Sequence, residues 1–95
     1  MSPLLIVQRA DGFEHALELC NGVRHGLVAA LFSRSSKLQQ KFLVEARAGI
    51  LKLNSATAGV AASLPFGGWK ASGIGPPEHG EADRHFYTRT QTIYE

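Results

Sequence analysis

Residues 27–53 read LVAALFSRSSKLQQKFLVEARAGILKL, two short apolar runs on either side of an amphipathic segment. The runs 27–32 and 50–53 are typical of strands covered on both faces of a parallel sheet. The segment between them carries apolar side chains at helical spacing: Leu38, Phe42 and Ala46. The candidate caps of this predicted helix are Ser33, Ser35 and Ser36, and Gly49 is expected to end it.

The preceding residues show the same order of elements. Leu4–Val7 is a continuous apolar run and is predicted to be a strand. A helix is expected next, with Asp11 as N-cap, Glu14 as its capping-box partner and Asn21-Gly22 at its end. Its apolar face is predicted to consist of Phe13, Ala16, Leu17 and Cys20. The order strand, helix, strand, helix, strand predicts an α/β fold with a βαβαβ parallel sheet.

The composition changes after Asn54. Six of the ten glycines and three of the four prolines lie between Gly59 and Gly80, which indicates a long functional loop. A short helix starting near Pro76 and a final strand over residues 88–94 are expected after it. We therefore divide a single partial domain, residues 1–95, into a βαβαβ unit, a glycine-rich loop and a tail: residues 1–54, 55–80 and 81–95.

Bulk properties exclude several classes of protein. The net charge of +2 comes from basic residues that are scattered among acidic ones, so we expect no nucleic-acid partner. No apolar run approaches the length of a membrane span, and the amino terminus lacks the features of a signal peptide, so a cytoplasmic protein without a membrane partner is predicted. The single cysteine cannot form an internal disulfide.

Familiar site motifs are incomplete in this sequence. Gly73-Ile74-Gly75 would need a third glycine where Glu78 stands, which argues against a dinucleotide-binding turn. Cys20 is interpreted as a small hydrophobic residue of the helix face and not as a nucleophile. The four histidines lack zinc-site spacing. No catalytic, cofactor-binding or metal-binding residue is therefore predicted.

The most specific motif is Leu64–Gly75, with the pattern P-F-G-G-x-K-x-S-G-x-G. This pattern resembles a segment near the carboxyl end of aldehyde dehydrogenases. Five further segments resemble the last part of the same family, so the likeness covers essentially the whole chain: residues 3–7, 13–21, 26–33, 47–54 and 86–94.

The resemblance implies the carboxyl-terminal portion of an enzyme that oxidises an aldehyde to a carboxylic acid with NAD or NADP. In such enzymes the cysteine nucleophile, the glutamate base and the nucleotide domain lie upstream, so this chain alone is expected to be inactive and to bind no cofactor. By resemblance, Asn54 and Phe66 line the substrate tunnel. The last strand is expected to mediate self-association, and the missing amino-terminal part of the enzyme is a second possible partner. The alternative is an independent α/β interaction or regulatory module that uses the glycine-rich loop.

Overall fold

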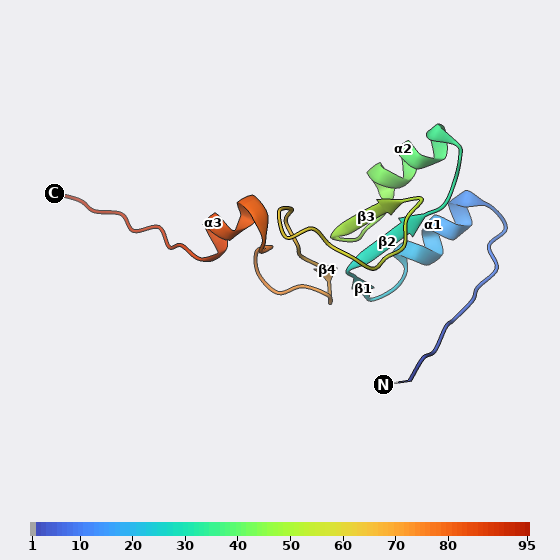
Figure 1. Ribbon diagram of the computed structural model, residues 1–95, viewed down its shortest axis with the longest axis horizontal. Helices are drawn as coiled ribbons and strands as arrows, with labels where there is room; N and C mark the ends of the chain where they lie inside the picture. The colour runs from blue at the N-terminus through green and yellow to red at the C-terminus, as the bar shows by residue number, and fades with distance from the viewer. Residues whose placement is uncertain (1) are drawn as a thin grey trace.

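The computed structural model describes residues 2–95, which form an elongated molecule of 63 × 36 × 23 Å (Figure 1). Helices and strands are concentrated between residues 13 and 53, and the chain extends away from them after the last helix. The elements in chain order are α1 (Phe13–Asn21), β1 (His25–Gly26), β2 (Val28–Leu31), α2 (Ser36–Glu45), β3 (Ile50–Leu53), β4 (Trp69–Lys70), the 3-10 helix η1 (Gly80–Ala82) and α3 (Asp83–Phe86).

The central unit is β2–α2–β3, as the sequence predicted. β2 and β3 pair in parallel, in a register that runs from Val28 opposite Ile50 to Leu31 opposite Leu53. Helix α2 forms the crossover that a parallel pair requires. A second, two-residue pair joins β1 to β4 in antiparallel orientation, with Gly26 opposite Trp69.

The hydrophobic core lies between the parallel strands β2 and β3 and helices α1 and α2. Phe42 from α2 is 4% exposed and is the largest of the buried side chains. The other buried core residues are Leu17, Ala29, Ala46 and Ala48, with Phe13, Leu31, Leu51 and Leu53 packed against them. The core is therefore small and depends heavily on one aromatic ring.

Helix α1 ends where predicted but differs from the prediction at its start and on its predicted apolar face. Its N-cap is Gly12, without a side-chain cap, so the expected capping box of Asp11 and Glu14 is wrong. The helix does end at Asn21, but Gly22 has right-handed dihedral angles. Only part of the predicted apolar face is covered, because a sheet of two strands offers little surface. Leu17 is buried, whereas Cys20 is exposed, which corrects its expected burial.

Helix α2 begins as predicted and ends earlier. The Ser35 hydroxyl accepts a hydrogen bond from the backbone N–H of Leu38, the usual N-cap interaction. The helix stops at Glu45, before the predicted end at Gly49. Asn21 explains this end, because its amide donates to the Glu45 carbonyl at 2.9 Å and accepts from the Arg47 backbone N–H at 2.8 Å. The amide of a distant residue thus satisfies the helix terminus.

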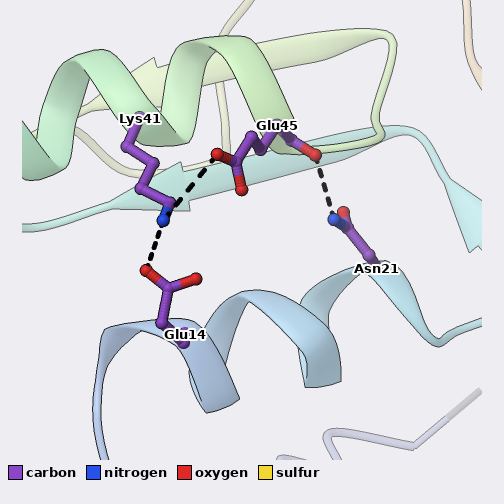
Figure 2. A network of polar contacts seen from close by, with 4 residues as sticks. All are labelled: Glu14, Asn21, Lys41 and Glu45. Carbon is purple, nitrogen blue, oxygen red and sulfur yellow. Dashed lines mark hydrogen bonds and ion pairs between the residues drawn. The ribbon is translucent and has the colours of Figure 1, made fainter.

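A polar network also links α1 to α2 (Figure 2). Lys41 Nζ donates to Glu14 Oε1 at 2.5 Å and lies 3.8 Å from Glu45 Oε1. The hydrogen bond to Glu14 raises the pKa of Lys41 above its ordinary value. The contribution of this ion pair to the stability of the fold is therefore complete below the ordinary pKa of lysine. It is lost as the pH rises through the raised pKa of Lys41. These side chains are partly exposed, so salt weakens their attraction.

The predicted strands at the two ends of the chain are absent. Leu4–Val7 carries no strand, and its side chains are about four-fifths exposed. Residues 88–94 also form no strand and extend away from the body (Figure 1). A strand requires a hydrogen-bonded neighbour, and neither segment has one among residues 2–95. The predicted βαβαβ unit is therefore reduced to βαβ.

The glycine-rich loop contains little regular structure. Residues 55–80 carry β4 and one isolated bridge between Phe66 and Glu78. The helix expected from Pro76 begins only at Gly80, as the short 3-10 helix η1 followed by α3. Within the part of the chain that the structure describes, no helix has the length and apolar character needed to cross a bilayer.

Candidate functional site

A cleft of about 550 Å³ lies along the glycine-rich loop. Its lining is mostly apolar or glycine, a composition typical of sites for small organic molecules. Glu78 is the one ionisable residue among the lining residues. The full set is Leu27, Gly49, Pro65, Phe66, Gly67, Gly68, Trp69, Ser72, Gly73, Ile74, Gly75, Pro76, Pro77, Glu78 and Phe86.

Close backbone packing shapes the floor of this cleft. A Cβ added at Gly49, just before β3, would overlap the carbonyl group of Gly67. A Cβ added at Gly73 would overlap the carbonyl group of Gly68 in the same way. Only glycine permits backbones to approach this closely. The glycines therefore bring the loop against the start of β3 and fold it back on itself.

Side chains of the loop then anchor it to the α1–β1 connection. The Ser72 hydroxyl accepts from the Gly26 backbone N–H at 3.0 Å. Lys70 Nζ donates to the carbonyl oxygens of Asn21 at 2.8 Å and Val23 at 3.1 Å. Lys70 thus places a positive charge at the carboxyl end of α1, where the helix dipole favours it. These contacts give the lysine and serine of the motif defined structural roles.

Phe66, a predicted tunnel residue, lies in the cleft lining. Its backbone and that of Glu78 exchange two hydrogen bonds, of 2.6 and 3.0 Å. Its ring packs against the imidazole of His79, with the ring centres 5.6 Å apart. Phe66 is half-buried, so part of its surface remains exposed.

Asn54, the other predicted tunnel residue, is not among the residues that line the cleft. Its side chain binds the backbone of Ser33, accepting from the N–H at 2.8 Å and donating to the carbonyl at 3.0 Å. Its φ of 51° is one that asparagine tolerates. Asn54 therefore ties the ends of β2 and β3 together, and its tunnel role stays a prediction.

The segment Gly73–Gly75 lacks the helix that follows a dinucleotide-binding turn. The segment Gly73–Gly75 follows a two-residue strand and leads into Pro76-Pro77, with no helix before Gly80. A pyrophosphate site of the usual kind needs a helix amino terminus directly after the glycines. Residues 2–95 also contain no group of three or more metal-ligating side chains.

Residues outside the two predicted ones contribute to the cleft. Trp69 and Ile74 line the cleft and expose large apolar surfaces, and the His79 ring packs on the ring of Phe66. Glycine density indicated a close backbone approach, but no local signal specified Gly49 as the partner of Gly67. The positive φ of His79 likewise has no counterpart in local sequence propensity.

The sequence model of the aldehyde dehydrogenase family matches residues 1–93. The chain belongs to this family. It is 49% identical over 72 residues to N-succinylglutamate 5-semialdehyde dehydrogenase 2 of Caulobacter vibrioides, covering 76% of this chain and 15% of the relative. It is 35% identical over 92 residues to alpha-ketoglutaric semialdehyde dehydrogenase of Bacillus subtilis, covering 97% of this chain and 19% of the relative.

Solved aldehyde dehydrogenases share the backbone arrangement. A G234S mutant of betaine aldehyde dehydrogenase from Staphylococcus aureus superposes with a TM-score of 0.82 at 28% identity, covering 90% of this chain and 17% of that enzyme. Betaine aldehyde dehydrogenase from the same organism has also been solved with NAD+. The chain thus spans less than a fifth of the length of these relatives.

Proposed function

We propose that this chain forms the carboxyl-terminal part of the catalytic domain of an NAD- or NADP-dependent enzyme that oxidises an aldehyde to a carboxylic acid. The observation that carries the proposal is the family match over residues 1–93 together with an apolar cleft around Phe66. In this proposal the cleft forms one wall of the substrate tunnel. The nucleophile, the water-activating base and the dinucleotide site come from residues outside this chain.

The proposed substrate is a semialdehyde that carries a carboxylate. Support comes from the names of two relatives, which act on N-succinylglutamate 5-semialdehyde and alpha-ketoglutaric semialdehyde. Because Glu78 is the ionisable residue lining the cleft, the carboxylate would be repelled there. We therefore expect the apolar chain of the substrate, and not its carboxylate, to contact Phe66.

By itself, the 95-residue chain should neither oxidise aldehydes nor bind NAD or NADP. Oxidation through a covalent intermediate needs a thiolate beside the aldehyde, and Cys20 is exposed on α1 and absent from the cleft lining. The measurement is cofactor reduction with a panel of aldehydes, together with calorimetric titration of both dinucleotides. Turnover that disappears in Cys20→Ser would contradict this expectation.

In the enzyme that carries this chain, Phe66→Ala should change the ranking of aldehydes. Losing an apolar wall contact shifts the ratio of kcat/KM between two aldehydes by about tenfold or more. Its effect on unfolding should stay below the loss of about 3–5 kcal/mol typical of a core phenylalanine. Steady-state kinetics on aldehydes that carry the same end group but differ in the length of the apolar chain, with urea denaturation, separates the two effects.

Phe66→Leu provides the matched control, because it keeps an apolar side chain at the wall. We expect this variant to retain most of the original ranking. A stability loss in the core range with an unchanged ranking in Phe66→Ala would reject the tunnel role of Phe66.

We also propose that residues 88–94 pair with a sheet of another subunit. The segment is extended and exposed and has no pairing partner among residues 2–95. Such unpaired backbone groups favour association with another chain. Deleting residues 88–95 should therefore convert an oligomer to a smaller species, as measured by light scattering.

Proline substitution tests whether association depends on backbone hydrogen bonds of the tail, because it removes donors without shortening the chain. Thr90→Pro combined with Thr92→Pro removes two N–H donors while keeping the full length. The double variant should dissociate as the deletion does. A parent chain that is already monomeric, or a proline variant of unchanged mass, would count against the pairing.

A further inference from the structure

His79 has a backbone conformation that is unusual for its residue type. Its φ of 73° and ψ of 153° lie close to a region populated almost entirely by glycine. A histidine at such a position is strained and is kept only where its surroundings hold it. Its backbone N–H donates to Asp83 Oδ1 at 2.6 Å, which fixes the turn before η1.

The imidazole of His79 has an aromatic neighbour. It packs on the ring of Phe66, with centres 5.6 Å apart and planes inclined by 31°. Its Nδ1 is enclosed and has no hydrogen-bond partner within residues 2–95. The aromatic contact with Phe66 is therefore the interaction that the structure records for the His79 ring within residues 2–95.

The contact complements the backbone bridge next to it. Two hydrogen bonds between Phe66 and Glu78 fix the main chain of Phe66 but leave the rotation of its side chain free. The adjacent imidazole packs on the ring of Phe66, and Phe66 lines the cleft whereas His79 is not among the lining residues. The main-chain bridge and the imidazole together define where the ring lies.

We propose that His79 is a positioning residue that holds the Phe66 ring over the cleft and so defines the shape presented to the substrate. This inference rests on the proposed function for its consequence in catalysis, whereas the positioning itself concerns the 95-residue chain alone. It leads to an unusual expectation: replacing His79 by glycine relieves the backbone strain while it releases the Phe66 ring.

The experiment compares ringless and ring-bearing variants of the full chain. His79→Gly and His79→Asn both remove the ring, glycine alone being suited to this φ and ψ, and His79→Phe restores a ring. Urea denaturation measures stability, and NMR of chain carrying 13C-labelled phenylalanine reports the Phe66 ring, assigned with Phe66→Leu. We expect the Phe66 signals to collapse toward averaged positions in both ringless variants, with a kept or raised urea midpoint in His79→Gly, and His79→Phe to keep the signals dispersed.

Two results would overturn the proposal. The first is unchanged dispersion of the Phe66 signals in the ringless variants. The second is a loss of dispersion that only follows a fall in the urea midpoint, as general destabilisation would produce. The ringless pair decides the matter alone if His79→Phe does not fold. A purely structural histidine would lower the midpoint and the dispersion together.

Kinetics of the enzyme that carries the chain tests the catalytic consequence separately. With a released Phe66 ring, we expect KM for the aldehyde to rise about three- to tenfold, with a smaller change in kcat, because uniform binding is lost. An averaged ring with unchanged KM would reject the tunnel role of Phe66 and leave the positioning by His79 intact.

Discussion

Phe42→Ala should destabilise this chain by about 3–5 kcal/mol, the usual loss for a phenylalanine removed from a core. Phe42 is 4% exposed, and the buried residues around it are small apart from Leu17. Few side chains can therefore move to fill the cavity. Because domains of this size are stable by about 5–15 kcal/mol in total, this loss removes a large part of the stability and should lower the urea midpoint strongly.

Urea denaturation followed by circular dichroism measures this loss. Phe32→Ala is the matched control, since Phe32 follows β2 and is 69% exposed. The control should change stability by less than about 0.5 kcal/mol, as for most surface substitutions. Similar losses in both variants would show that the core does not depend on Phe42.

Gly49→Ala should have the next largest effect, about 2–3 kcal/mol, at the upper end of the range for overpacking. The new methyl group would overlap the carbonyl group of Gly67, which is backbone and cannot rotate away. Gly49 cannot retreat easily either, because its N–H donates to the Gly26 carbonyl at 3.0 Å. The expected response is separation of the glycine-rich loop from β3, which opens the cleft.

Two measurements check this expectation. Urea denaturation gives the stability, and fluorescence quenching by acrylamide reports the exposure of Trp69, the single tryptophan, which lines the cleft. Gly12→Ala is the control, because no atom lies within 4 Å of the added methyl group and its φ of 170° suits any residue. Unchanged stability and quenching in Gly49→Ala would contradict the close packing of Gly49 on Gly67.

Local patterns were sufficient to predict the central unit. The run at 50–53 coincides with β3, and Ser35 caps α2 as expected. Hydrophobic periodicity also identified Phe42 and Ala46 as buried. These features depend on residues a few positions apart, so the sequence contains the information directly.

The terminal segments show where local patterns are insufficient. Leu4–Val7 and residues 88–94 have the composition of strands, yet neither is paired in the structure. Composition expresses a preference for extended backbone, and a strand forms only where a neighbour supplies hydrogen bonds. The exposure of Cys20 has a related cause. Only the part of the α1 face that packs against other elements is buried.

The sequence by itself determined the family motif, the parallel β2–α2–β3 unit and the presence of Phe66 in a glycine-rich loop. Tertiary structure alone decided that Gly49 meets Gly67, that Asn54 binds Ser33, and that the His79 imidazole supports Phe66. Each of these contacts joins residues that are more than ten positions apart in the sequence. Such separations exceed the spacing within one helix turn or along one strand. Such partners are selected by how the whole chain packs, because backbone proximity and side-chain hydrogen bonds depend on distances that local propensity does not encode.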